Sequence, residues 1–329
     1  MRLERIGVIG GGAWATALAA LSARPDRIVV QWMRDAETAS AINRLHENPR
    51  RLPGISLHMG IEAVTDPAQL AGAEAFIAAV PTSAMREVLT HCVPYIPAEA
   101  RLIIAAKGYE RGTSVPMSAV ASDTLGVMAF ILSGPTFAED VARELPAAAV
   151  LAGPTVGVAA DLGNALSTAS FRTYFNADVA GVQFGGAAKN VLAIACGMAA
   201  GMRLGDSARA ALITRAAAEL ARLGHALGVS PETLNGLSCL GDLILTAMSA
   251  RSRNFSLGFA LGEGRSLADA LASSRGVCEG VPTAPVIVGL ARAHRTEAPI
   301  ATAVEAILTG RSSPAEQMAD LLGRPLRSE

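Results

Sequence analysis

Two lysines are the residues of this sequence whose type is best suited to proton transfer. The other 26 of its 28 basic residues are arginines, and both lysines lie in short apolar segments that contain glycine, residues 105–108 and 185–190. A partly buried lysine can release and regain a proton near neutral pH, whereas a guanidinium effectively cannot. Lys107 and Lys189 are therefore candidates for chemistry, although two surface lysines could also remain by chance.

Two further groups of polar residues suggest functions that helix packing alone does not require. Asp242 and Thr246 are four residues apart, so they share one face of a helix. Ser252, Arg253 and Asn254 offer a hydroxyl, a charged fork and an amide, which together suit a phosphate monoester. The same triplet could instead be a capping turn, because serine and asparagine are common helix caps.

A glycine-rich segment near the N-terminus has the form of a dinucleotide-binding turn. It follows the apolar run 6–9 and opens a helical pattern. Gly10 would permit the tight turn, and Gly12 would let the backbone approach a pyrophosphate at the positive end of the helix. Ala15 replaces the third glycine of the pattern. A turn that serves packing alone is the alternative.

The end of the next apolar run bears on which cofactor is bound. An acidic residue about 20 positions beyond the glycines would hold the ribose of NAD, whereas an arginine would accept the 2′-phosphate of NADP. Arg34 stands at that point and Asp35 follows it, so NADP is favoured and NAD stays open. Arg50 and Arg51 could assist, or could be ordinary surface charge.

The two lysines are expected on different elements. Lys107 follows the apolar run 102–105, at the carboxyl end of a predicted strand, where open α/β sheets bind their ligands. Lys189 lies early in a nearly apolar helix, after two glycines that allow close backbone approach. Desolvation in such a helix would lower the pKa of its amine and make it a usable proton donor and acceptor.

The pattern of apolar segments predicts an α/β fold with two domains. Up to residue 178, short apolar runs alternate with helical stretches, which is typical of a doubly wound parallel sheet of the Rossmann type. Residues 179–329 show only helical periodicity. We therefore expect a dinucleotide-binding domain, 1–178, and an all-helical substrate-binding domain, 179–329. The predicted strands are 6–9, 28–32, 75–80, 102–105, 130–132, 147–151 and 171–175.

Composition excludes several classes of function. The net charge of −1 argues against a protein that binds nucleic acid or a membrane surface. No segment has the roughly 18 uninterrupted apolar residues of a membrane span. The four cysteines are widely spaced, which indicates reduced core thiols of a cytoplasmic protein. No metal site is predicted.

The motifs occur in the order seen in bacterial NAD(P)-dependent glycerol-3-phosphate dehydrogenase, which the sequence resembles over nearly its whole length. Each segment is weak evidence alone, but the set is specific. The segments that carry the resemblance are 10–14, 106–108, 133–138, 185–190, 211–215, 241–243, 252–254 and 279–281.

This resemblance implies reversible reduction of dihydroxyacetone phosphate to sn-glycerol 3-phosphate, the step that supplies the glycerol backbone of phospholipids. It also implies a homodimer. It implies that Lys189 is the proton donor and acceptor, that Lys107 contacts substrate and cofactor, and that Asp242 and Thr246 orient Lys189 and the substrate hydroxyls. Further implied substrate contacts are Gly134, Thr136, Asn190, Ser252, Arg253 and Asn254. Implied cofactor contacts are Gly10, Gly12, Ala13, Trp14, Arg34, Arg51, Lys107, Ala138, Arg253, Val277 and Glu279.

Two other classes of protein compete with this interpretation. A β-hydroxyacid or 6-phosphogluconate-type dehydrogenase also combines a nucleotide domain with a helical domain, but the triplet 252–254 argues against it. A non-catalytic dinucleotide sensor would need the glycine turn and have no use for Lys189 or Asp242.

Overall fold

The protein divides into two compact units, Met1–Gln183 and Phe184–Glu329. The structure is a computed structural model that describes residues 2–274 and 276–325. The helix that leads into the second unit, α7, begins at Val179.

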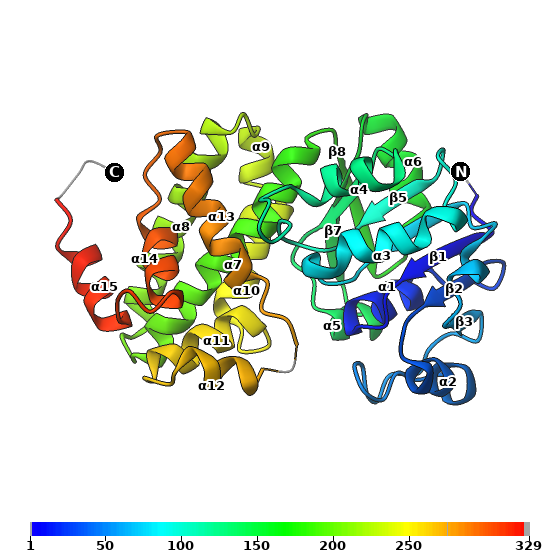
Figure 1. The fold of residues 1–329 in the computed structure, drawn as a ribbon, viewed down its shortest axis with the longest axis horizontal. Helices are drawn as coiled ribbons and strands as arrows, with labels where there is room; N and C mark the ends of the chain where they lie inside the picture. The colour runs from blue at the N-terminus through cyan, green and yellow to red at the C-terminus, as the bar shows by residue number, and fades with distance from the viewer. Residues whose placement is uncertain (1, 275, 326–329) are drawn as a thin grey trace. The chain divides into compact units, whose positions relative to one another are not determined.

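An eight-stranded sheet forms the centre of the N-terminal unit (Figure 1), with the strand order β3-β2-β1-β4-β5-β6-β7-β8. Its first six positions have the Rossmann order, and each of the seven predicted runs contains a strand. The strands are β1 (Arg5–Ile9), β2 (Ile28–Trp32), β3 (Ile61–Val64), β4 (Ala75–Ala78), β5 (Arg101–Ile104), β6 (Phe130–Ser133), β7 (Ala147–Ala152) and β8 (Phe171–Asn176).

The edge strand β3 was missing from the sequence prediction. Its residues alternate, with Ile61 and Ala63 buried and Glu62 exposed. A half-exposed edge strand of this kind lacks the continuous apolar run of a strand that is covered on both faces. The residues of β3 therefore lack the signal that marks the buried strands.

The predicted parallel, doubly wound sheet is confirmed except at one pair of strands. β6 and β7 are antiparallel, with Ser133 paired to Val150, while the other neighbouring strands are parallel. The connection between them contains only the five-residue α5, so the chain turns back beside β6 without crossing the sheet.

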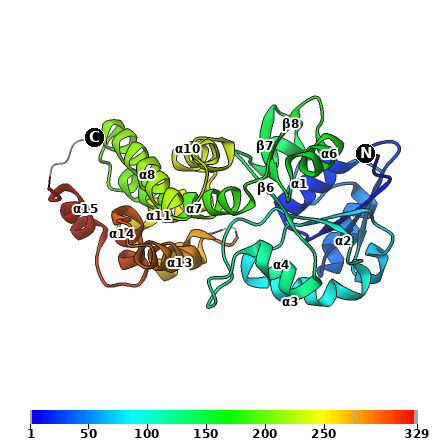
Figure 2. The same cartoon turned by 90° about the horizontal axis from the view of Figure 1, so that it is seen from above.

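Helices cover both faces of this sheet. Figure 2 shows α1 and α6 on one face and α3 and α4 on the other. A buried cluster joins Leu18 of α1 and Leu162 of α6 to strand residues such as Val8 and Ile103. The helices are α1 (Ala13–Ser22), α2 (Ala36–Leu45), α3 (Met85–Cys92), α4 (Met117–Leu125), α5 (Ala138–Ala142) and α6 (Val156–Leu166), with short 3-10 turns at Pro67–Leu70, Thr82–Ala84 and Val93–Tyr95.

Every regular element that the structure describes in the C-terminal unit, residues 184–274 and 276–325, is a helix, as predicted. Its helices are α7 (Val179–Gly201), α8 (Asp206–Ala226), α9 (Pro231–Leu234), α10 (Asp242–Met248), α11 (Arg253–Gly262), α12 (Leu267–Ala272), α13 (Gly280–Ala293), α14 (Pro299–Leu308) and α15 (Pro314–Leu322).

Four glycines bring α7 and α11 into backbone contact. Gly197 and Gly201 on α7 face Gly258 and Gly262 on α11. A Cβ atom at any of these positions would lie 2.0–2.3 Å from a carbonyl oxygen of the other helix. The two helices can approach this closely only because all four side chains are hydrogen.

The helix α7 is long and apolar enough to cross a membrane, by length and composition alone. Its most apolar 18-residue window is 83% buried inside the structure, as is typical of a core helix. The four cysteines are free and buried, as expected for core thiols. Burial raises the pKa of Cys92 to about 11 and that of Cys196 and Cys239 to about 12.

Candidate functional site

The glycine turn after β1 is tight and leaves the N-terminus of α1 open. Gly10 has a φ of 131°, and a Cβ there would lie 3.0 Å from the Ala79 carbonyl oxygen that follows β4. Gly12 is the N-cap of α1, offers no side-chain cap, and would place a Cβ in open space. Because a helix N-terminus attracts anions and this one is open, the turn fits a bound pyrophosphate.

Three buried side chains that the sequence did not point to form a hydrogen-bond network with the carbonyl groups of this turn. Gln31 Nε2 donates to the Gly10 carbonyl at 2.9 Å, and Asn48 Nδ2 donates to the Gly11 carbonyl at 3.2 Å. Both amides also donate to Thr16 Oγ1, at 3.1 and 2.8 Å. Gln31 and Thr16 stand out as polar residues within apolar runs, and buried polar groups need partners. No local pattern marks Asn48.

Two charged residues, Arg34 and Asp35, follow β2, and within the described part of the chain only the side chain of Asp35 is engaged by its neighbours. Asp35 caps α2, accepting from the backbone N–H groups of Glu37 and Thr38, and forms an ion pair with Arg50. The bond from the Thr38 backbone is the main cause that lowers the pKa of Asp35. Arg34 is exposed. The carboxylate is thus already occupied, whereas the neighbouring guanidinium lies at the surface.

The predicted contacts Ala13, Trp14 and Ala138 lie together. All three pack against the small buried cluster formed by Ala17, Leu52 and Ile55. The predicted cofactor residue Arg51, in the same segment as Leu52, is exposed.

Within the N-terminal unit, Lys107 lies beside Gly134 and Thr136, two residues predicted to contact the substrate. Its Nζ donates to the Gly134 carbonyl at 2.9 Å, and the Thr136 hydroxyl donates to the same oxygen at 3.3 Å. A Cβ at Gly134 would lie 2.7 Å from the Ala149 Cα, so only glycine fits there. The strands β5 and β6, whose ends these residues follow, are neighbours in the sheet.

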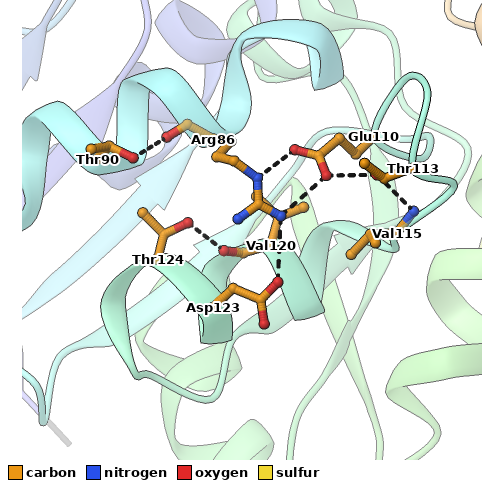
Figure 3. A network of polar contacts seen from close by, with 8 residues as sticks. All are labelled: Arg86, Thr90, Glu110, Thr113, Val115, Val120, Asp123 and Thr124. Atoms are coloured by element: carbon orange, nitrogen blue, oxygen red, sulfur yellow. Dashed lines mark hydrogen bonds and ion pairs between the residues drawn. The ribbon is translucent and has the colours of Figure 1, made fainter.

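An ion-pair network fixes the segment that follows Lys107 (Figure 3). Arg86 on α3 donates from Nε to Glu110 Oε1 at 2.6 Å, and from Nη2 to Glu110 Oε2 at 3.1 Å. Arg86 also reaches Asp123 on α4, and Thr113 donates to Glu110. The hydrogen bond from Arg86 is the main cause that lowers the pKa of Glu110. The sequence analysis did not single out this network.

Lys189, Asp242 and Thr246 converge inside the C-terminal unit. Lys189 Nζ donates to Asp242 Oδ1 at 3.0 Å and to Thr246 Oγ1 at 2.6 Å, and the Thr246 hydroxyl lies 3.2 Å from the same carboxylate oxygen. The side chains of Lys189 and Asp242 are only 9% and 2% exposed. The arrangement is a buried charge pair whose members are further held by a hydroxyl, a geometry suited to moving one proton at a fixed amine.

A π-helical turn and a glycine place this triad. The turn Leu237–Gly241 leads directly into α10, on which Asp242 and Thr246 are one turn apart. A Cβ at Gly185 would lie 2.7 Å from the Cys239 Cβ, so this glycine lets α7 pack against the turn. Such π-helical turns are frequent at functional sites, and this one was not predicted from the sequence.

The predicted phosphate triplet begins helix α11. Ser252 is its N-cap and accepts from the Phe255 backbone N–H, so the capping interpretation of this serine is confirmed. Arg253 occupies the first helical position and is exposed. Asn254 is buried and donates to Asn190 Oδ1 at 2.8 Å. The open guanidinium at a helix N-terminus is a suitable anion site.

The remaining predicted cofactor residues lie before α13. Val277 is exposed, and Glu279 is the N-cap residue of that helix. The next residue, Gly280, donates its backbone N–H to Asn254 Oδ1 at 3.0 Å. This bond connects the start of α13 to α11 and, through Asn254, to Asn190 of α7.

The chain is similar to known proteins over nearly its whole length. The family model for the NAD-dependent glycerol-3-phosphate dehydrogenase N-terminus matches residues 5–158, and the model for its C-terminus matches residues 178–319. Glycerol-3-phosphate dehydrogenase [NAD(P)+] of Rhodospirillum rubrum is 51% identical over 99% of this chain and 94% of its own length. The protein of that name from Parvibaculum lavamentivorans is 48% identical over 99% of this chain and 98% of its own length.

Solved structures give the same result. The crystal structure of glycerol-3-phosphate dehydrogenase from Coxiella burnetii has a TM-score of 0.92 and 36% identity, and covers 98% of this chain and 99% of its own. A ketopantoate reductase from Ralstonia eutropha, with a TM-score of 0.61 and 16% identity, shares the fold alone. With both family models matched and close relatives covering nearly its whole length, the chain belongs to the NAD-dependent glycerol-3-phosphate dehydrogenase family.

Proposed function

We propose that this chain reversibly reduces dihydroxyacetone phosphate to sn-glycerol 3-phosphate with NADPH or NADH, and that Lys189 is its proton donor and acceptor. The observation that carries the assignment of Lys189 is its buried contact with Asp242 and Thr246. Membership of the family supports the reaction.

The proposed chemistry needs one proton at the substrate oxygen. A bound nicotinamide cofactor supplies a hydride to the carbonyl carbon. As that oxygen gains negative charge, Lys189 Nζ would donate a proton to it, and would take the proton back in the reverse direction. Asp242 Oδ1 and Thr246 Oγ1 would hold Nζ in one place, so no rotamer search precedes the transfer.

The N-terminus of α11 is the proposed anchor for the substrate phosphate. Arg253 would bind it through charge-assisted hydrogen bonds, with Ser252 and the helix N-terminus adding to the attraction. The hydrogen bond from Asn254 Nδ2 to Asn190 Oδ1 would orient their amides as further substrate contacts. Binding a group that does not react is useful because its energy helps to position the carbonyl that does.

The remaining proposed contacts serve the cofactor and the substrate. The turn from Gly10 to Gly12 would hold the pyrophosphate, and Arg34 would favour NADP over NAD. Further proposed cofactor contacts are Ala13, Trp14, Arg51, Ala138, Arg253, Val277 and Glu279. Lys107, Gly134 and Thr136 would contact the substrate, and Lys107 also the cofactor. We propose that residues 1–178 are the dinucleotide-binding domain and residues 179–329 the substrate-binding domain, each with a few contacts to the other ligand.

We extend the proposal to the cellular setting. A phosphorylated glycerol is the backbone of phospholipids, which is the use that we propose for the product. The four buried thiols support a reducing compartment, the cytoplasm. We also propose a homodimer, which sedimentation of the purified protein would test against a monomer.

The direct test is a substrate comparison. Purified protein, NADPH and dihydroxyacetone phosphate would be mixed and followed at the nicotinamide absorbance, with a β-keto acid in parallel. We expect NADPH to be oxidised only when dihydroxyacetone phosphate is present. Oxidation of NADPH with the β-keto acid alone would instead assign the chain a β-hydroxyacid dehydrogenase activity. Binding of NADPH without oxidation by either ketone would instead indicate a dinucleotide sensor.

A further inference from the structure

One buried asparagine joins the glycine turn to the segment between α2 and β3. Asn48 is completely buried. Its Nδ2 donates to Thr16 Oγ1 at 2.8 Å and to the Gly11 carbonyl at 3.2 Å. Its Oδ1 accepts from the Arg51 backbone N–H at 3.1 Å. Both ends of the amide are therefore used, one on the turn and the other on the segment that carries an exposed arginine.

The contact with Gly11 determines the direction of a backbone amide in the turn. In a trans peptide unit the C=O and the N–H point in opposite directions. With the Gly11 carbonyl drawn towards Asn48, the N–H of Gly12 points away from it. Gln31 does the same for the preceding unit by binding the Gly10 carbonyl, which turns the N–H of Gly11 outward. The side chains of Gln31 and Asn48 thus fix the orientation of two successive backbone amides in the turn.

The same segment also packs on α1 through apolar contacts. Leu52 and Ile55 pack against Ala17, and the Leu52 backbone N–H donates to the Asn48 carbonyl at 2.8 Å. The segment is therefore held to α1 both by this apolar cluster and by the Asn48 amide. The cluster fixes how far the segment lies from the helix, while the directional bonds of Asn48 fix its alignment with the turn.

We propose that Asn48 is a positioning residue for cofactor binding, because one side chain aligns the pyrophosphate turn with the segment that carries Arg51. The inference rests on the proposed cofactor role of the glycine turn. Asn48 acts through Gly11 and Arg51 and takes no part in proton transfer at Lys189. Its loss should therefore weaken the binding of NADPH and NADH without slowing turnover once the cofactor is saturating.

The test compares Asn48→Ala with a control of the same residue type. Asn43→Ala also removes two side-chain bonds to backbone, with the N–H and C=O of Ala63, and neither bond involves a residue of the turn. The dissociation constants of NADPH and NADH would be measured by nicotinamide fluorescence, together with kcat, KM and the melting temperature. We expect Asn48→Ala to raise both dissociation constants about tenfold or more, because buried partners lose their bonds.

In the same test, kcat and the KM for dihydroxyacetone phosphate at saturating cofactor should stay within about twofold of wild type. Asn43 is more exposed, so the melting temperatures show how much of any change follows stability alone. Cofactor affinity within twofold of wild type for Asn48→Ala, or an equal loss in Asn43→Ala, would overturn the proposal. A wild-type protein that binds NADPH but leaves dihydroxyacetone phosphate unreduced would instead defeat the proposed reaction.

A second variant covers the case in which Asn48→Ala does not fold. Thr16→Val keeps the shape of the side chain and removes the oxygen that accepts from Asn48 and Gln31. Both amides then lose the bond that fixes their rotamers, while their carbonyl partners in the turn remain. A rise of severalfold in the cofactor dissociation constants, with kcat retained, supports the proposal, and unchanged affinity contradicts it.

Discussion

Lys189 and Asp242, 53 positions apart in the sequence, form a 3.0 Å ion pair in which both side chains are almost completely buried. Removing one partner of such a pair leaves an uncompensated buried charge, which is strongly unfavourable. The pair therefore constrains which substitutions can test the chemistry. A replacement must keep the positive charge beside Asp242 while changing its ability to release a proton.

Lys189→Arg meets this condition. The guanidinium keeps the charge but effectively cannot give up a proton, so we expect kcat to fall by about two to four orders of magnitude. NADPH affinity, measured by fluorescence titration, should stay close to wild type. Lys107→Arg is the control, since it makes the same exchange at the other lysine. Normal turnover by Lys189→Arg would show that the proton comes from another group.

Arg34→Ala should weaken NADPH more than NADH. The exposed guanidinium is the proposed partner of the 2′-phosphate, and hydrogen bonds to a charged group contribute about 1.5–3 kcal/mol. We therefore expect about a tenfold or larger loss of NADPH affinity by isothermal titration, with little change for NADH. Arg44→Ala, at an exposed position on α2, controls for general surface charge. An equal loss for both cofactors would remove this role from Arg34.

Glu219 should make stability depend on pH. This buried residue of α8 accepts from the backbone N–H groups of Ile300 and Ala301 at the start of α14, at 2.8 and 2.9 Å. Burial raises its pKa from 4.5 to about 7, despite the opposing effect of these two bonds. The folded protein thus holds this proton more tightly than the unfolded chain does.

The sign of the effect follows from that difference. As pH rises from about 4.5 to about 7, the unfolded chain releases the proton first, so stability falls by up to about 3 kcal/mol and then stays level. Glu219→Gln removes this contribution. We expect the melting temperature of wild type to decline relative to the variant between pH 5 and 7. Parallel curves for the two proteins would contradict the prediction.

Gly258→Ala should be strongly destabilising. Its Cβ would lie 2.0 Å from the Ile194 carbonyl oxygen, so α7 and α11 would have to separate. We expect a loss of several kcal/mol in chemical denaturation, or failure to fold. Gly289→Ala is the matched control on α13, where a Cβ meets no atom within 4 Å. That change should stabilise the helix by about 0.5–1 kcal/mol, and equal effects of the two substitutions would be inconsistent with the close helix contact.

The sequence predicted the parts of the structure that have local or periodic signals. The buried strands could be recognised by continuous apolar runs, and the shared helix face of Asp242 and Thr246 by their spacing. Their convergence on Lys189 came from the family resemblance, because no local pattern encodes a contact across 53 positions.

Tertiary pairing accounts for what the sequence did not show. The direction of β7 depends on how the chain returns from β6, and the residues of the two strands do not indicate that path. Asn48 looks like an ordinary loop residue until its contact with Thr16, 32 positions earlier, is visible. Gln31 could have been noticed, since a glutamine in an apolar strand requires buried partners.

The burial of all four cysteines has a practical consequence for spectroscopy. Thiol-directed labels react with an accessible thiolate, and burial keeps Cys92, Cys196 and Cys239 protonated. A cysteine introduced at one exposed position would therefore be the preferred target of a maleimide fluorophore. Dye pairs for distance measurements could be attached in this way to the native background, without first removing any of its own cysteines.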